Sequence, residues 1–270
     1  MLLNATSKKL NGMTTVVTGG GTGLGRAMSL ALADAGSDVV IAGRRTGPIN
    51  DVLKQIEGKG KDALAVSADL TDSSQVDMLF EKTLARFGKV DALINNAGMV
   101  GEQGGKPIWE ITDSEFRLGI DANLTSAFYC SRAISKHMVD RKKGTIINVA
   151  SGFGFRGGRN SYVYGCSKGG VIQLTRILAT SLGRYGVTCN CIVPGYFPTE
   201  GTATSTEILP KSEHIPVGRA GDPSELGPIA VFLVSESSKY MNGTFFGADG
   251  GGLAGGYAPT GPGPIIPIDK

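Results

Sequence analysis

Short runs of β-branched and apolar residues recur along this chain, and each is followed by a longer segment with the apolar spacing of a helix. The runs cover residues 14–18, 38–42, 63–67, 92–95, 144–150 and 187–193. Strands separated by helices pair in parallel, and because these runs lack strict polar alternation, both faces of the sheet must be covered. The pattern predicts an α/β fold, a doubly wound parallel sheet of roughly six or seven strands in a single domain. Ligands then bind at the carboxyl ends of the strands.

Charge and composition exclude several partners. The chain has 27 Lys and Arg against 24 Asp and Glu, without a long basic run, so we expect no nucleic-acid partner. No apolar stretch is long enough to span a bilayer, and the first residues lack a secretion signal, so we expect a cytoplasmic protein with no membrane partner. The four cysteines show no C-x-x-C spacing and no nearby histidines. We therefore expect reduced thiols and no metal site.

A glycine-rich turn follows the first strand. It reads Gly19-Gly20-Gly21-Thr22-Gly23-Leu24-Gly25 and opens an Ala/Leu-rich helix over residues 26–35. Glycines allow a tight turn and let a pyrophosphate approach the bare amides at the positive end of the helix. An isolated glycine cluster is usually an ordinary loop, but the order strand, turn, helix favours a dinucleotide cradle. The spacing T-G-x-x-x-G-x-G differs from the usual G-x-G-x-x-G.

Tyr164 and Lys168 stand four residues apart, with Ser151 upstream. On a helix, residues at this spacing share a face, so the ammonium group is expected to lower the pKa of the phenol and make it a proton donor and acceptor. The pair alone also fits an ordinary surface pair. Tyr162 is the rival, but the residue four beyond it is Cys166, which cannot supply a permanent cation.

Taken together, these motifs resemble the short-chain dehydrogenase/reductase family from residue 10 to about residue 252. Besides T-G-x-x-x-G-x-G and Tyr-x-x-x-Lys, the matches are Asp69-Leu70, Asn95-Asn96-Ala97-Gly98, Asn123, Ser151, Pro194-Gly195 with Thr199, and Asp249-Gly250-Gly251. The resemblance implies a Rossmann-like fold and an NAD(P)-dependent oxidoreductase that interconverts a secondary alcohol and a ketone. A binding-only sensor or scaffold of the same fold is the alternative, and we expect such a protein to lack part of the Asn-Ser-Tyr-Lys set. Epimerase or dehydratase chemistry, which occurs among longer relatives of this family, would need a larger substrate domain than a chain of this length provides.

The resemblance also implies a role for each catalytic candidate. Tyr164 would be the general acid or base, and Lys168 would hold the phenolate and the nicotinamide ribose. Ser151 would stabilise the charge that develops on the substrate oxygen. Asn123 would position a water that links Lys168 to solvent.

By the same resemblance, the dinucleotide would contact the ends of several strands. Asp69 and Leu70 would meet the adenine, and Pro194, Gly195 and Thr199 the carboxamide. The full set is Gly19, Thr22, Gly23, Leu24, Gly25, Arg44, Arg45, Asp69, Leu70, Asn95, Ala97, Gly98, Tyr164, Lys168, Pro194, Gly195 and Thr199.

The second strand runs into Gly43-Arg44-Arg45, without the acidic residue that would bind a ribose 2′-hydroxyl. Guanidinium groups recognise phosphate well, so we expect NADP(H). If Arg44 stacks on adenine and Arg45 is solvated, NAD(H) is also possible.

The substrate is not predicted beyond a small alcohol or ketone. Its pocket should be built from residues 99–106, 152–160 and a family-typical lid over residues 201–216. In the second of these stretches, Arg156 and Arg159 can meet an anion or face water. The segment after Gly98 lacks the Arg-Asp usual in 3-oxoacyl carrier-protein reductases.

Outside the motifs, His137 and His214 lack ligand spacing and are expected to be structural or solvent-facing, and Trp109 to pack at a helix start. The apolar helices over residues 113–139 and 163–185 resemble those that pair between subunits of the family, which implies a homotetramer or homodimer. We expect the domain to span residues 1–254, followed by a Gly/Pro-rich extended tail over residues 255–270. The tail either frays or lies against a neighbouring subunit.

Overall fold

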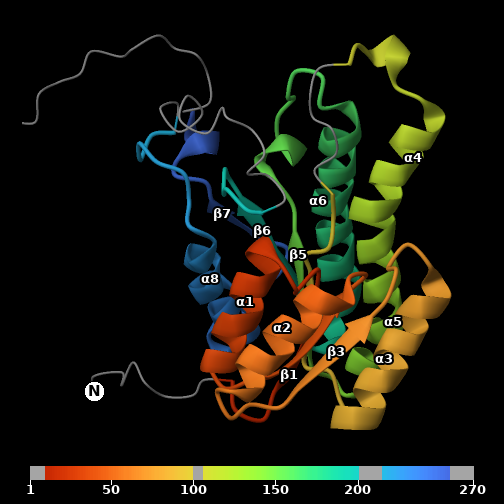
Figure 1. Cartoon of the computed structure of the whole chain (residues 1–270), viewed down its shortest axis with the longest axis vertical. Coiled ribbons are helices and arrows are strands. Elements are labelled where there is room, and N and C mark those ends of the chain that lie inside the picture. Colours follow the sequence, from red (N-terminus) through yellow and green to blue (C-terminus); the bar gives the residue numbers. More distant parts are fainter. Residues whose placement is uncertain (1–9, 100–105, 201–214, 256–270) are drawn as a thin grey trace, which may run out of the picture.

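The computed structural model describes residues 10–99, 106–200 and 215–255. Its strands form one parallel sheet in the order β3-β2-β1-β4-β5-β6-β7 (Figure 1). They are β1 (Thr14–Thr18), β2 (Asp38–Gly43), β3 (Ala63–Ser67), β4 (Ala92–Asn95), β5 (Gly144–Val149), β6 (Val187–Pro194) and β7 (Phe245–Ala248). The predicted doubly wound sheet is confirmed, and the six predicted runs match β1 to β6 within one residue at each end. The short Phe-Phe-Gly-Ala run of the edge strand β7 was not among them.

The helices also follow the predicted alternation. They are α1 (Gly23–Asp34), α2 (Thr46–Glu57), α3 (Ser73–Phe87), α4 (Asp113–Ile120), α5 (Ser126–Asp140), α6 (Tyr162–Leu182) and α8 (Gly227–Val234). Residues Asp121–Thr125 form a π-helical turn that joins α4 to α5. The described part of the chain includes no helix long and apolar enough to cross a membrane.

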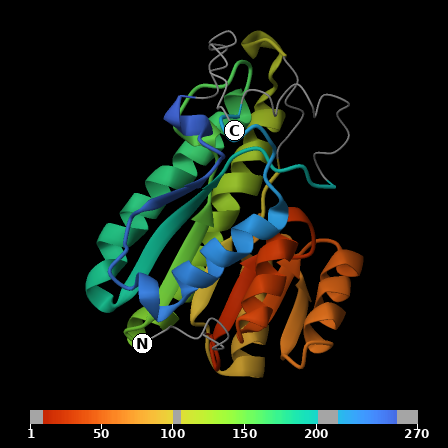
Figure 2. The same ribbon diagram turned by 90° about the vertical axis from the view of Figure 1, so that its left-hand side faces the viewer.

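Two apolar layers cover the sheet because successive strand residues point to opposite faces. Val17, Ile41 and Ile147 pack with α1, α2 and α8, whereas their neighbours Val16 and Val40 pack with α3, α5 and α6. Figure 2 shows α8 lying beside α1 on the first face. Since buried side chains fill both faces, the polar residues available for chemistry lie at the strand ends.

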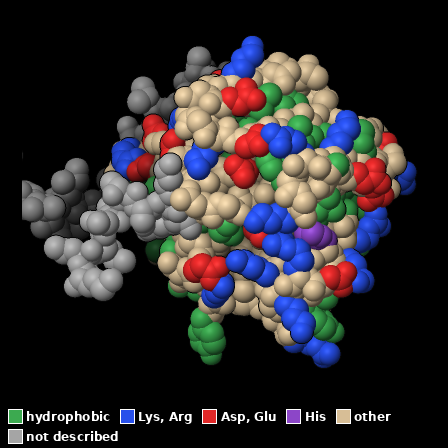
Figure 3. Space-filling view, turned by 90° about the horizontal axis from the view of Figure 1, so that it is seen from below, with side chains coloured by type: hydrophobic (Ala, Val, Ile, Leu, Met, Phe, Trp, Pro, Cys, Tyr) green, Lys and Arg blue, Asp and Glu red, His purple; other side chains and the backbone are tan. Residues whose placement is uncertain are grey.

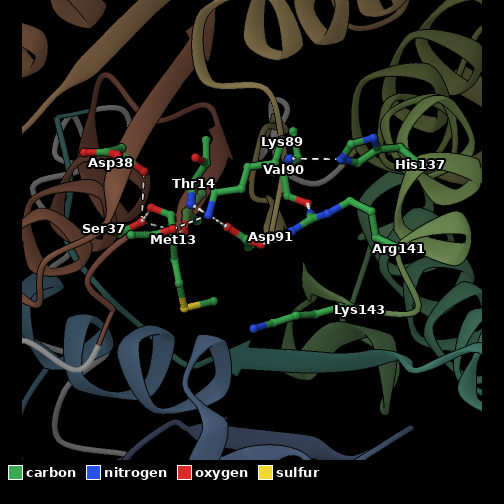
Figure 4. Close-up of polar contacts among 12 residues, drawn as sticks. Met13, Thr14, Ser37, Asp38, Lys89, Val90, Asp91, His137, Arg141 and Lys143 are labelled. Carbon is green, nitrogen blue, oxygen red and sulfur yellow. Dashed lines mark hydrogen bonds and ion pairs between the residues drawn. The ribbon is translucent and has the colours of Figure 1, made fainter.

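A buried carboxylate ties together the end of the sheet where the strands begin. Asp91, which precedes β4, is 3% exposed. Thr14 N donates to its Oδ2 at 2.9 Å, and Arg141 Nη2 at the end of α5 donates to its Oδ1 at 2.7 Å (Figure 4). Burial raises the pKa of Asp91, but the hydrogen bonds from Arg141 and Thr14 outweigh it, so that the pKa is lower than usual. The carboxylate therefore joins β1, β4 and α5 on the side away from the predicted site.

His137 belongs to the same end of the molecule. Its Nε2 accepts a hydrogen bond from Val90 N at 3.3 Å, and burial, together with Arg141, lowers its pKa. The view from below shows Lys and Arg side chains beside a histidine side chain (Figure 3). His137 thus has the structural role expected of it, while His214 lies outside the described residues.

Candidate active site

The predicted site residues lie where the fold leads us to expect ligands, after the carboxyl ends of the strands. Gly19 to Gly25 follow β1, Arg44 and Arg45 follow β2, and Asp69 follows β3. Ala97 and Gly98 follow β4, Ser151 follows β5, and Pro194 ends β6. Tyr164 and Lys168 lie on α6, and Asn123 lies on the π-helical turn.

The glycine-rich turn is fixed by Thr18, the last residue of β1, and by Asn96, the first residue after β4. Thr18 Oγ1 accepts hydrogen bonds from Asn96 N and Ala97 N, each at 3.0 Å, and Asn96 Nδ2 donates to Thr18 O at 3.0 Å. A Cβ atom on Gly25 would lie 2.1 Å from Gly19 O, so only glycine allows α1 to start so close to the turn. Thr18 and Asn96 were quoted in the motifs but not named as site residues, although they hold the cradle in shape.

The amino end of α1 is left open for an anion. Its N-cap residue, Thr22, makes no side-chain cap hydrogen bond, and the first turn contains no acidic residue. Asp72 caps α3, and Thr112 and Glu115 form a capping box on α4, whereas α2 and α6, like α1, begin without a side-chain cap. The free amides and the helix dipole of α1 therefore favour a negative group at this point.

Two guanidinium groups stand beside this open end. Arg44 and Arg45 are exposed, and Arg45 Nη2 donates to Thr22 Oγ1 at 3.5 Å. Asp69 lies near Arg44, and two hydrogen bonds from Thr71 to its carboxylate lower the pKa of Asp69. On the other side of the turn, a Cβ on Gly23 would lie 3.1 Å from Thr199 Cγ2, so Thr199 contacts the start of α1.

Lys168 reaches the base of the site from α6. Its side chain is buried, and Nζ donates to Val149 O at the end of β5, at 2.8 Å. A Cβ on Gly98 would lie 3.6 Å from Lys168 Nζ and 2.5 Å from Asn123 Oδ1, so these three residues are neighbours. Burial lowers the pKa of Lys168 to about 8.

The side chain of Asn123 is held by its own hydrogen bonds. Its Oδ1 accepts from Met99 N at 2.9 Å, while Nδ2 donates to Met99 O at 3.1 Å and to Ser167 Oγ at 3.0 Å. Asn123 therefore anchors the segment after β4 to α6. The predicted water between Asn123 and Lys168 stays a prediction.

Tyr164 stands between Ser151 and Lys168. Burial raises the pKa of Tyr164, and a hydrogen bond with the Ser151 side chain acts in the opposite direction. Lys168 Nζ lies 5.7 Å from the centre of the Tyr164 ring. The expectation that the ammonium group lowers the pKa of this phenol is therefore wrong for the protein alone, because burial outweighs the other effects. Burial thus favours the neutral phenol of Tyr164 and lowers the pKa of the Lys168 ammonium group.

Some predicted contact residues are used by the fold itself. Asn95 Nδ2 donates to Ser131 Oγ and to Asn148 Oδ1, each at 2.9 Å, and so points into the core. Leu70 is buried within the apolar layer under α3, and Gly195 N donates to Ala248 O at 2.8 Å. The side chains of Asn95 and Leu70 therefore contact the protein interior, and their predicted contacts with the cofactor stay predictions.

The remaining sequence expectations have mixed outcomes. Tyr162 donates to Asn160 Oδ1 at 3.3 Å, and Cys166 lies exposed on α6. Trp109 does not pack at a helix start as predicted: it lies in a 3-10 turn, Ile108–Glu110, with 82% of its surface exposed. Residues 100–105 of the pocket, 201–214 of the lid and 256–270 of the tail lie outside the described residues. No cluster of three His, Cys, Asp or Glu that can hold a metal occurs in the parts described.

A nicotinamide dinucleotide fits these residues. The uncapped end of α1 and the close approach of Gly19 and Gly25 suit a pyrophosphate, and Arg44 with Arg45 suits a further phosphate or an adenine face. The cradle follows β1, and Ser151 follows β5, which is separated from β1 in the sheet by β4 alone; Tyr164 and Lys168 lie on α6. The arrangement can therefore hold a redox cofactor beside a proton donor.

Comparisons with known proteins agree with this chemistry. The family model for short chain dehydrogenases matches residues 13–209. A 2-dehydro-3-deoxy-D-gluconate 5-dehydrogenase from Escherichia coli is 38% identical, covering 94% of this chain and 100% of the relative. A 3-oxoacyl-[acyl-carrier-protein] reductase from Synechocystis is 34% identical over 90% of this chain and 97% of that protein. A solved structure from Beutenbergia cavernae, assigned as an NAD(P)-dependent gluconate 5-dehydrogenase with bound NADP at low occupancy, is 37% identical with a TM-score of 0.85, covering 92% and 99% of the two chains.

Proposed function

The chain belongs to the short-chain dehydrogenase family, and on that premise we propose that Tyr164, Ser151 and Lys168 are its catalytic residues. Like its named relatives it is an NAD(P)-dependent oxidoreductase that interconverts an alcohol and a ketone, rather than an inactive nucleotide-binding protein. The observation that carries the assignment of roles is the contact of the Tyr164 phenol with the Ser151 hydroxyl, beside the buried Lys168.

The roles follow from the protonation states that the pocket favours. In ketone reduction, the neutral Tyr164 donates its proton to the substrate oxygen, and Ser151 donates a hydrogen bond to the same oxygen. Lys168, while protonated, stabilises the phenolate that is left behind. In the reverse reaction, the phenolate accepts the proton of the alcohol. A bound nicotinamide dinucleotide would accept or supply the hydride.

We propose that the preferred cofactor is NADP(H), held by the Gly19–Gly25 turn with Arg44 and Arg45 near its second phosphate. Both guanidinium groups are exposed at the tip of β2, and Arg45 is anchored on Thr22 beside the open end of α1. No acidic side chain follows Gly43 there to favour a free ribose hydroxyl.

We propose that the substrate is a sugar acid, with its reacting hydroxyl or keto group on a secondary carbon. The support comes from the relatives named as dehydrogenases of 2-dehydro-3-deoxy-D-gluconate and gluconate. A 3-oxoacyl thioester is less favoured because Met99-Val100 stand after Gly98 where Arg-Asp is usual in those reductases.

We also propose a homo-oligomer, which sedimentation analysis would test. Phe116, Phe128 and Ile177 on α4, α5 and α6 are each more than two-fifths exposed, and such apolar surfaces are typical of subunit contacts.

The four cysteines are free thiols, which supports a cytoplasmic location.

Replacement of Tyr164 by Phe tests the catalytic assignment. The variant should lose at least about 100-fold in kcat, given typical acid-base contributions of roughly 10²- to 10⁴-fold, while the Kd of the cofactor changes little. Tyr162→Phe is the matched control, because Tyr162 lies on the same helix but bonds to Asn160. The assignment fails if Tyr164→Phe keeps more than about a tenth of the wild-type rate.

A further inference from the structure

Ser167 on α6 is buried between two residues of the site and bonds to both. Its side chain is 0% exposed. Ser167 Oγ donates to Tyr164 O at 2.9 Å and accepts from Asn123 Nδ2 at 3.0 Å. The first bond is the ordinary return of a serine hydroxyl to its own helix. The second bond crosses to another element, so it ties the π-helical turn to the helix that carries Tyr164 and Lys168.

The π-helical turn and α4 pack along α6 on both sides of this second bond (Figure 1). A Cβ on Gly119 would lie 2.1 Å from Val163 Cγ1, and a Cβ on Gly170 would lie 2.5 Å from Leu124 Cδ2. Glycine at these two positions lets the elements approach closely. The hydrogen bond lies between the two contacts, within a close-packed interface. A π-turn inside a helix is rare and frequently occurs at a functional site.

Through Asn123, the serine also reaches the segment after β4. Met99 N donates to Asn123 Oδ1 at 2.9 Å, and Asn123 Nδ2 donates to Met99 O at 3.1 Å. Gly98 comes just before, and a Cβ on it would lie 3.6 Å from Lys168 Nζ. Because the Asn123 amide bonds to this segment and to α6, it fixes the segment at the level of the lysine amine. The segment therefore forms part of the cover that keeps Lys168 buried.

The surroundings of Lys168 make its amine sensitive to this cover. Of the residues that the structure describes, the titratable side chains that face it are Tyr164 on the same helix and Cys191 on β6. The end of β5 presents the Val149 carbonyl group, and the π-helical turn presents the uncharged Asn123 amide. Burial lowers the pKa of Lys168 and outweighs the opposite effect of Cys191. Any opening to water should therefore raise this pKa toward its ordinary value of 10.5.

We infer that Ser167 is a positioning residue of the active site, which holds the Asn123 amide against α6 and so keeps the segment after β4 over the Lys168 amine. This inference rests on the proposed function, in which protonated Lys168 stabilises the phenolate of Tyr164. Without the serine hydroxyl, Asn123 keeps its bonds to Met99 but loses its bond to α6. The amide and the segment then move away together, and water reaches the amine.

The test compares the loss of this hydroxyl with the loss of a matched hydroxyl on the same helix. Thr175 Oγ1 donates to Val171 O and accepts from Asn148 Nδ2, each at 2.9 Å, and Thr175 is as buried as Ser167. Its partner Asn148 is buried in β5 and has no assigned role in the site. Ser167→Ala and Thr175→Val each remove one buried hydroxyl, so both should lower the Tm at pH 7 by several degrees.

The first readout is the titration of Lys168 in the absence of cofactor. It is isolated by comparing the Tm of each protein with that of its Lys168→Met counterpart across a pH series. In wild type, the lysine form should be the less stable of the two, and the difference should begin to shrink at about pH 8. In Ser167→Ala, the difference should be smaller at pH 7 and should begin to shrink at least about 0.5 pH unit higher, because a less buried amine has a higher pKa.

Thr175→Val should keep the wild-type onset. Ser167→Cys fills the same space with a weaker hydrogen-bonding group, so it should shift the onset in the same direction as Ser167→Ala and replaces that variant if the alanine form does not fold. A wild-type onset in the Ser167 variants, or an equal shift in Thr175→Val, would overturn the inference.

The second readout is the reduction of a panel of ketones by NADPH. For any ketone that wild type reduces, kcat should fall about tenfold or more in Ser167→Ala, with a smaller change in KM, and should stay within about twofold in Thr175→Val. Asn123→Ala should show a similar loss, and adding Ser167→Ala to it should cost less than about twofold more, because the serine acts through the amide. An unchanged kcat in Ser167→Ala, or two losses that multiply, would overturn the inference.

The two readouts also separate this inference from the proposed function. If wild type reduces none of the ketones, the result counts against the proposed function. The titration of Lys168 needs neither substrate nor cofactor, and it still decides whether Ser167 keeps the amine covered.

Discussion

Replacing Lys168 by Met should make the cofactor-free protein more stable, although it should abolish catalysis. The ammonium group of Lys168 is buried, and burial lowers its pKa from 10.5 to about 8. Each pKa unit corresponds to about 1.4 kcal/mol, so keeping this charge inside the folded protein costs roughly 3 kcal/mol at neutral pH. The hydrogen bond from Nζ to Val149 O offsets about 1 kcal/mol of that cost. Methionine has a similar length and no charge, so we expect a net gain of about 2 kcal/mol.

The gain should depend on pH with a definite sign. In the unfolded chain, the lysine keeps its proton up to about pH 10.5, whereas in the folded protein it loses the proton above about pH 8. Between these values the unfolded state binds more protons, so the stability of the wild type rises with pH. Lys168→Met lacks this titration. Its advantage over wild type should therefore be fully present below pH 8 and should disappear by about pH 10.5.

Thermal unfolding of both proteins at pH 7 and at pH 10, at one protein concentration and without cofactor, measures the effect. For a chain of this size, about 2 kcal/mol corresponds to a rise in Tm of roughly 4 to 8 °C at pH 7. Lys54→Met on α2 is the control, because Lys54 is exposed and should change stability by less than about 0.5 kcal/mol at either pH. A Lys168→Met variant that is less stable than wild type at pH 7, or that keeps its full gain at pH 10, would refute the reasoning.

Two further predictions concern the cradle. Gly25→Ala places a Cβ 2.1 Å from Gly19 O, so the turn must shift, and calorimetric titration should show at least about tenfold weaker binding of NADP⁺. The control Gly47→Ala, whose Cβ meets nothing within 4 Å, should bind NADP⁺ as wild type does. Equal affinities in all three proteins would contradict the role of the turn. Wild type should have a higher kcat/KM with NADP⁺ than with NAD⁺. Arg44→Ala should lower kcat/KM for NADP⁺ by roughly tenfold or more and leave kcat/KM for NAD⁺ nearly unchanged. A tenfold preference of wild type for NAD⁺ would overturn the cofactor proposal.

Local patterns in the sequence were sufficient for much of the fold. The runs of β-branched residues located β1 to β6 because a strand buried on both faces requires apolar side chains at almost every position. The motif T-G-x-x-x-G-x-G pointed to Gly25, and in the structure a Cβ atom on Gly25 would lie 2.1 Å from Gly19 O. The short edge strand β7 has no run of β-branched residues: it has only four residues, two of them Gly and Ala.

Features that depend on several elements could not be predicted from the sequence. The hydrogen bonds of the Asn95 amide to Ser131 and Asn148 depend on two other elements, while its predicted contact with the cofactor stays a prediction. The π-helical turn that holds Asn123 has no composition signal of its own. The pKa of Tyr164 depends on how deeply α6 is buried, and spacing along a helix contains no information about burial. For the same reason, the exposure of Trp109 was missed.

The two ends of the sheet differ in how their charges are satisfied, and this difference supports placing the function at the carboxyl ends. At the end where the strands begin, Asp91 receives hydrogen bonds from Thr14 and Arg141, which stabilise its charge. At the other end, α1, like α2 and α6, lacks a side-chain cap, and Lys168 carries a charge that burial disfavours. Both of these features are costs to the protein alone, and an anionic cofactor would offset both, because its phosphates would meet the α1 amides and its hydroxyls would accept from Lys168. The stability lost at this end is therefore expected to return as binding energy when the cofactor is present.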